Sequence, residues 1–146
     1  MLENDKLFKV SVTVAGPPVG KARPRFTRTG HVYTPAKSKD YEKLVSQSAW
    51  VAMVQAKIKP TEKPVYLEIE AYMPIPKSWS KAKQDQARMG VIRPAKPDLD
   101  NIIKAILDGC NSVIYRDDVQ VHSIKARKLY ENYEHLPSVE LTASWE

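Results

Sequence analysis

The chain has 146 residues, 42% of them hydrophobic and 27% charged, a composition typical of one globular domain over residues 1–146. Its 23 Lys and Arg residues outnumber 17 Asp and Glu residues, and the net charge of +6 favours an anionic partner. The sequence has no apolar run long enough to span a membrane, no signal-peptide core and a single cysteine, Cys110, so we expect a cytoplasmic protein without membrane partners or disulfides.

The first half of the chain alternates strand and helix patterns. Alternating apolar and polar residues over 8–14 predict a strand with one buried face, which ends at residues 16–20. The stretch 25–33 predicts a short hairpin that turns near Gly30. Apolar residues at helical spacing over 37–57 predict an amphipathic helix.

The middle of the chain predicts a second strand and two helices. The strand covers residues 65–71, and a short helix capped by Ser78 or Ser80 ends near Gly90. A further helix spans residues 100–108 and is terminated by Gly109.

The last third of the chain predicts two more strands. One begins at Val119 and has a bulge near Ser123, and the other covers residues 139–145 and runs antiparallel to it. Together these elements predict a single small α+β, or mixed α/β, domain with one mixed sheet flanked by helices. Cys110 lies at the end of an apolar helical stripe, which favours buried packing for its thiol.

Five aspartates gather in this basic chain between residues 98 and 118: Asp98, Asp100, Asp108, Asp117 and Asp118. Hard divalent cations such as Mg²⁺ take carboxylate oxygens together with waters and substrate phosphates. Basic surroundings attract a polyanion to the same place. The combination indicates metal-dependent chemistry on a nucleic acid backbone.

Two of these acids come just before or at the start of the third predicted helix. Asp98 and Asp100 share a face only where the backbone is extended, and Pro97 favours an extended residue before it. We therefore expect a strand-to-helix junction that points both carboxylates to one side. Lys104, one turn further on, is placed to hold a phosphate or stabilise the developing oxyanion.

The alternation of the predicted strand distinguishes between the two acids of the second pair, Asp117 and Asp118. If Val119 and Val121 face the core, Asp118 lies on the opposite face and is a better metal ligand than Asp117. A magnesium ion held by Asp98, Asp100 and Asp118 would activate water and neutralise charge on a phosphodiester.

Ordinary structural interpretations compete with this site. They are a helix cap at Asp98 or Asp100, a turn at residues 117–118, and a surface ion pair between Lys104 and Asp108. Each is favoured when the residues are taken singly, whereas the grouping of the acids favours the metal site.

The basic residues gather away from the acids. Between residues 16 and 39 there are six basic residues and no acid, and we predict that Lys21, Arg23 and Arg25 contact phosphates because alternate residues of an extended segment project together. The alternative is a solvated basic loop. A second basic stretch over 77–96 fits either another phosphate-binding patch or a solvated helix face.

The acidic motifs resemble the signature of a known family. Lys-Pro-Asp-Leu-Asp-Asn-Ile-Ile-Lys-Ala-Ile-Leu-Asp-Gly at 96–109 and Arg-Asp-Asp-Val-Gln-Val at 116–121 are similar to motifs of the RusA family of Holliday-junction resolvases, found in bacteria and prophages. Gly-Lys-Ala-Arg-Pro-Arg-Phe at 20–26 and His-Val-Tyr-Thr-Pro at 31–35 resemble the amino-terminal region of that family. The similarity extends from the first strand to about Lys125.

This resemblance implies a function and a site. It implies a homodimer that binds four-way junction DNA and nicks two strands symmetrically in recombination and repair, using Mg²⁺, or Mn²⁺ in its place, and no organic cofactor. By motif position the catalytic acids and metal ligands would be Asp98, Asp100 and Asp118, and Lys104 matches the functional lysine. The alternatives are a non-catalytic dimer that binds branched DNA and a metal nuclease for flaps or structured RNA.

Overall fold

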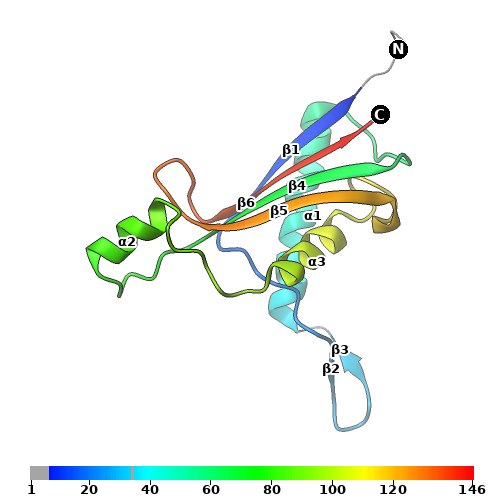
Figure 1. Ribbon diagram of the computed structural model, residues 1–146. Coiled ribbons are helices and arrows are strands. Elements are labelled where there is room, and N and C mark those ends of the chain that lie inside the picture. Colours follow the sequence, from blue (N-terminus) through cyan, green and yellow to red (C-terminus); the bar gives the residue numbers. More distant parts are fainter. Residues whose placement is uncertain (1–6, 34) are drawn as a thin grey trace.

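The computed structural model describes residues 7–33 and 35–146 (Figure 1). Its main sheet has four strands, β1 (Phe8–Ala15), β4 (Val65–Met73), β5 (Val121–Tyr130) and β6 (Ser138–Trp145), in the order β1-β6-β4-β5. β4 and β5 are parallel, and β6 is antiparallel to both of its neighbours. The prediction of one small α+β domain with a mixed sheet is confirmed.

Two long helices lie side by side on one face of this sheet (Figure 1). They are α1 (Ala36–Ala56) and α3 (Leu99–Cys110), while the short helix α2 (Lys81–Arg88) lies beyond the sheet end (Figure 1). Ser80 caps α2 by accepting a hydrogen bond from the Lys83 amide at 3.2 Å, as one of the two predicted caps. The predicted hairpin is present as β2 (Arg25–Phe26) and β3 (Val32–Tyr33), which projects from the molecule near the start of α1 (Figure 1).

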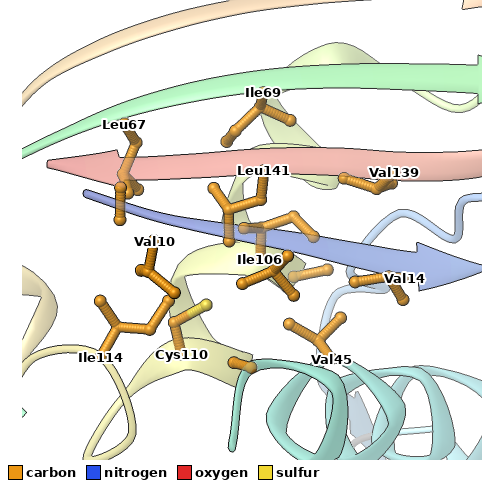
Figure 2. Packing of buried hydrophobic residues seen from close by; sticks show 14 of the residues in the cluster. Val10, Val14, Val45, Leu67, Ile69, Ile106, Cys110, Ile114, Val139 and Leu141 are labelled. Atoms are coloured by element: carbon orange, nitrogen blue, oxygen red, sulfur yellow. The ribbon is translucent and has the colours of Figure 1, made fainter. Parts of the chain in front are cut away.

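The core lies between the sheet and the α1–α3 pair, where alternate strand residues meet the helices (Figure 2). Leu141 points from β6 toward Ile106 of α3, and Val14 points from β1 toward Val45 of α1 (Figure 2). Cys110 is fully buried in this core, and burial raises the pKa of its thiol to about 12. The prediction of a packing role for this thiol is confirmed.

Gly109 does not terminate α3, contrary to the prediction from its residue type. The helix continues through Gly109 to Cys110, and Asn111 follows it with non-helical φ −57° and ψ 132°. A Cβ built on Gly109 would lie 2.5 Å from Cγ1 of Val45. Glycine stands here because α1 and α3 approach too closely for a side chain.

The strand predicted from Val119 begins two residues later, at Val121. Residues Asp118–Gln120 form a short 3-10 helix, η1, and the Val119 side chain is 83% exposed. The predicted bulge is confirmed, because Val65 pairs with Val121 while the next residue of β4 pairs with Ser123.

The last strand runs antiparallel to β5 as predicted, but the two are not neighbours. β4 lies between them, and β6 pairs with β4 on one side and with β1 on the other. Every second residue of β6 is buried, which suits an interior strand. Within residues 7–33 and 35–146, no helix has the length and apolar character that a membrane crossing requires.

Candidate metal and nucleic-acid site

Asp98 immediately precedes α3 and has an extended backbone, with φ −63° and ψ 141°. Residues 89–98 contain no strand, so the predicted strand-to-helix junction is a loop-to-helix junction, with Asp98 as the extended residue that leads into α3. The Asp98 carboxylate makes no capping hydrogen bond to the helix, and its Oδ1 lies 3.5 Å from Nζ of exposed Lys96. Its side chain is 56% exposed, so its oxygens are open to a ligand.

Asp100 lies in the first turn of α3, where the helix dipole favours negative charge. Its Oδ1 accepts a hydrogen bond from the Asn101 amide at 3.0 Å. Asp98 is therefore the N-cap residue of α3 by its backbone, but its carboxylate does not cap the helix, and Asp100 lies inside the first turn.

Asp117 and Asp118 are adjacent but have different surroundings. Asp117 caps η1, and its Oδ1 accepts from the Val119 amide at 3.1 Å. Gln120 completes a capping box, since its Oε1 accepts from the amides of Arg116 and Asp117 at 2.9 and 3.1 Å. The turn interpretation is thus right for Asp117, whose carboxylate serves the backbone.

Asp118 faces other charged groups. Partial burial, a hydrogen bond with Asp117 and the negative charges of Asp117 and Asp108 raise the pKa of Asp118, and Lys104 opposes that rise. Carboxylates that crowd together in this way favour a cation between them. The α3 residues Lys104 and Asp108 are therefore close enough to Asp118 to influence its ionisation.

Two polar residues that the sequence analysis missed hold the Asp118 loop in place. Tyr115 is fully buried and donates its hydroxyl hydrogen to the Leu107 carbonyl of α3 at 2.8 Å. Gln120 Nε2 donates to the carbonyls of Thr61 and Lys63 at 2.9 and 3.0 Å. The spacing of Asp117 and Gln120 matches a capping box and could have identified Gln120 from sequence.

Lys21 was predicted to contact phosphates, but the structure directs its ammonium toward two carboxylates. Nζ contacts Glu42 of α1 and lies 3.2 Å from Oδ2 of Asp108, and its side chain is only 20% exposed. Burial alone would lower the pKa of Lys21, but the hydrogen bonds to Glu42 and Asp108 outweigh it and the pKa is raised. Lys104 Nζ binds the other oxygen of Asp108 at 3.3 Å. Glu42, also missed from sequence, completes this four-residue network.

Arg23 and Arg25 are exposed, as expected of residues that bind an external anion. Arg25, Lys37 and Lys96 line an open groove of about 840 Å³ whose other walls are mainly apolar. The groove reaches Pro97, the residue before Asp98. Three cationic side chains therefore line a groove that extends to the residue before Asp98.

These features agree with the comparison with known proteins. A family model described as "Endodeoxyribonuclease RusA" matches residues 15–142. The chain belongs to the RusA family. This confirms the resemblance seen in the acidic motifs and makes the chain a nuclease of the hydrolase class. A Bacillus subtilis (strain 168) protein described as "Uncharacterized protein YqaN" is 39% identical over 130 residues, which cover 83% of this chain and 87% of the relative.

RusA nucleases depend in general on divalent metals. Among residues 7–33 and 35–146, no group of three or more acidic, histidine or cysteine side chains forms a ready metal cage. Asp98 and Asp100 are both exposed at the start of α3, and Asp118 is half-buried at the start of η1. Mg²⁺ commonly takes one or two carboxylates and completes its octahedron with waters and substrate phosphates. The donor set fits an ion of that kind.

Proposed function

We propose that this chain is a Holliday-junction resolvase that cuts four-way junctions by paired, symmetric nicks in DNA recombination and repair. The observation that carries the proposal is the two exposed carboxylates, Asp98 and Asp100, next to a groove whose lining includes three cations, in a chain of the RusA family. A nuclease for this substrate needs acids for a metal and cations for the backbone, and both occur here.

Asp98, Asp100 and Asp118 would hold Mg²⁺, or Mn²⁺ in its place. The bound ion supplies an activated water and neutralises charge on the phosphodiester. The carboxylates of Asp98 and Asp100 have oxygens open to solvent, and Asp118 is in a setting of like charges that a cation would relieve.

Lys104 would act at the phosphate. Its side chain is 56% exposed and is held by Asp108 on one side only, so its ammonium retains donors for a phosphate oxygen. Arg23 and Arg25 would bind the backbone of the DNA strand on its way to the acids.

Two copies of the chain would act together in the cytoplasm. A four-way junction has two-fold symmetry, and a dimer presents two equivalent sites to strands related by that symmetry. Paired nicks at matching positions follow from this arrangement.

The test is cleavage of a labelled four-way junction in Mg²⁺ by the wild type and by Asp100→Asn, with linear duplex as the substrate control. The matched variant is Asp85→Asn, which removes a carboxylate from α2 that pairs with Arg88. Symmetric nicks that vanish with Asp100→Asn and persist with Asp85→Asn would support the proposal. Junction binding without cleavage by the wild type would instead favour a non-catalytic branched-DNA binder, and preferential cutting of flaps or structured RNA would favour another nuclease class.

A further inference from the structure

A lysine outside the acidic motifs holds the backbone that leads to Asp98. Lys128 lies on β5, and its Nζ donates hydrogen bonds to the carbonyls of Ala95 and Pro97 at 2.8 and 3.0 Å. Pro97 is the residue directly before Asp98. The Lys128 ammonium therefore holds two backbone carbonyls of the segment that leads to Asp98 at the start of α3.

The direction of the Lys128 side chain follows from the strand. Residues two apart in a strand share a face, and Ala126 packs against the core on the side of the helices. Lys128 points to this same side and is half-buried, whereas Lys125 is exposed. Arg93 Nη1 also donates to the Lys128 carbonyl at 3.4 Å, so the connection from α2 to α3 runs along the end of β5.

The opposite side of the segment is closed by the loop after β1. A Cβ built on Gly20 would lie 3.0 Å from the Cβ atoms of Pro97 and Asn101. The Lys21 amide donates to the Asn101 carbonyl at 2.8 Å. The backbone before and after Asp98 is thus held between the Gly20 loop and Lys128.

We propose that Lys128 is a positioning residue for metal binding, because it fixes the backbone of Asp98 through the carbonyls of Ala95 and Pro97. The proposal rests on the proposed function, in which Asp98 is a metal ligand. Hydrogen bonds from a charged donor are stronger than neutral ones, so their loss frees the segment. Groups that orient metal ligands commonly change metal affinity or activity by about 10–100-fold when they are removed.

The experiment compares the wild type with Lys128→Met, which keeps an unbranched side chain one atom shorter and removes its donors. Mn²⁺ binding to the free protein is measured by electron paramagnetic resonance, junction binding is measured without metal, and cleavage is measured over a range of Mn²⁺ concentrations. We expect Mn²⁺ binding about tenfold weaker and a matching rise in the Mn²⁺ needed for cleavage. Metal-free junction affinity should stay within about twofold, because Lys128 does not contact DNA in this proposal.

Two variants separate positioning from loss of charge or of fold. Lys125→Met removes a cation from the same strand and should leave Mn²⁺ binding unchanged. Lys128→Arg keeps charged donors and should recover most of the affinity, and it also reports on the site if Lys128→Met fails to fold. Unchanged Mn²⁺ binding in Lys128→Met, or an Arg variant no better than the Met variant, would overturn the inference.

Failure of the underlying function gives a different result. If the wild type binds no Mn²⁺, or if Asp98→Asn binds it as well as the wild type, the metal site is wrong and the inference is overturned with it. If the wild type binds Mn²⁺ through Asp98 and Lys128→Met is indistinguishable from it, only the role of Lys128 is overturned.

Discussion

Lys21 and Asp108 join the loop after β1 to helix α3, with Nζ 3.2 Å from Oδ2. The same ammonium contacts Glu42, so three segments of the chain meet at one cation. Asp108 in turn holds Lys104, the residue proposed to act at the phosphate. A residue predicted to bind DNA therefore orders the proposed catalytic lysine through an acid that lies between them.

Replacing Lys21 by Met should reduce stability. Glu42 and Asp108 are only 23% and 19% exposed, so the loss of their shared cation leaves two poorly solvated carboxylates. We expect the free energy of unfolding to fall by about 1–2 kcal/mol, between the values typical of exposed and buried pairs. Urea denaturation at pH 7 measures the change. Lys43→Met, an exposed neighbour on α1, is the control and should have little effect.

The Lys21 contribution should also depend on pH. Its pKa in the folded protein is raised above the usual 10.5, so protonated Lys21 stabilises the folded state. This contribution is fully present below pH 10.5 and is lost as the pH rises through the folded-state pKa. The gap in stability between the wild type and Lys21→Met should therefore be constant from pH 6 to about 9 and close in more alkaline solution. A gap that does not change with pH would contradict the ionic origin of the effect.

Gly109→Ala should destabilise the protein although alanine is the better helix former. The new Cβ would meet Val45 Cγ1 at 2.5 Å and the Glu42 carbonyl at 3.1 Å, so α1 and α3 would have to separate. We expect a loss of about 1–3 kcal/mol from overpacking, against an intrinsic helix gain of about 1 kcal/mol. Thermal or urea unfolding gives the sign, and a more stable variant would refute the close approach.

A second substitution tests the same contact. Val45→Gly removes both side-chain atoms that the new Cβ would meet, Cγ1 at 2.5 Å and Cβ at 2.6 Å, so Gly109→Ala should be less harmful in that background. The double-mutant cycle should show a favourable coupling of at least about 0.5 kcal/mol. Simple additivity would place the cost of Gly109→Ala elsewhere.

The sequence predicted those features of the fold that depend on residues close to one another along the chain. The alternation of residues 8–14 predicted β1, and Ser80 was one of the two predicted caps of α2. Gly109 was misjudged because a glycine is used both to end a helix and to let two helices meet. Only the position of Val45 on α1 decides between these uses, and no pattern in the sequence supplies it.

The sequence indicated the residue types of the candidate site, but it did not predict the backbone conformation around them. Val119 was assigned to a strand from the spacing of two valines, but the capping box of Asp117 and Gln120 turns the chain first and leaves Val119 exposed. Asp118 was preferred over Asp117 on that wrong premise, although Asp117 is engaged in the turn for a different reason. Lys21 was grouped with Arg23 by charge, since its partner Glu42 is remote in sequence.

Asp118→Asn should stabilise the protein in the absence of metal. The pKa of Asp118 is raised in the folded state, mainly by partial burial and then by its acidic neighbours, so the ionised carboxylate costs stability at neutral pH. The gain at pH 7 should be less than about 1 kcal/mol, because the group is partly solvated. A raised carboxyl pKa costs nothing at pH values below the ordinary 3.8, so the gain should vanish there.

A bound metal ion should remove the stability advantage of Asp118→Asn over the wild type. Mg²⁺ or Mn²⁺ at ten times its Kd stabilises the protein that binds it by about 1.4 kcal/mol. The wild type should gain this amount and Asp118→Asn should gain less, as measured by denaturation with and without the ion. Equal gains in both proteins would remove Asp118 from the metal site, whether or not the variant cuts DNA.

Arg23→Gln and Arg25→Gln should each weaken junction binding and reduce its dependence on salt. Both residues are exposed, and Arg25 lines the groove that reaches Pro97. Removing one phosphate contact lowers the slope of log affinity against log salt by about 1. Lys9→Gln is the control, because Lys9 is an exposed residue of β1 whose neighbour Val10 points to the helices. If all three variants lose affinity equally, the effect is one of net charge and the groove does not guide the DNA. If only the arginine variants lose it, the strand enters along the groove toward Asp98.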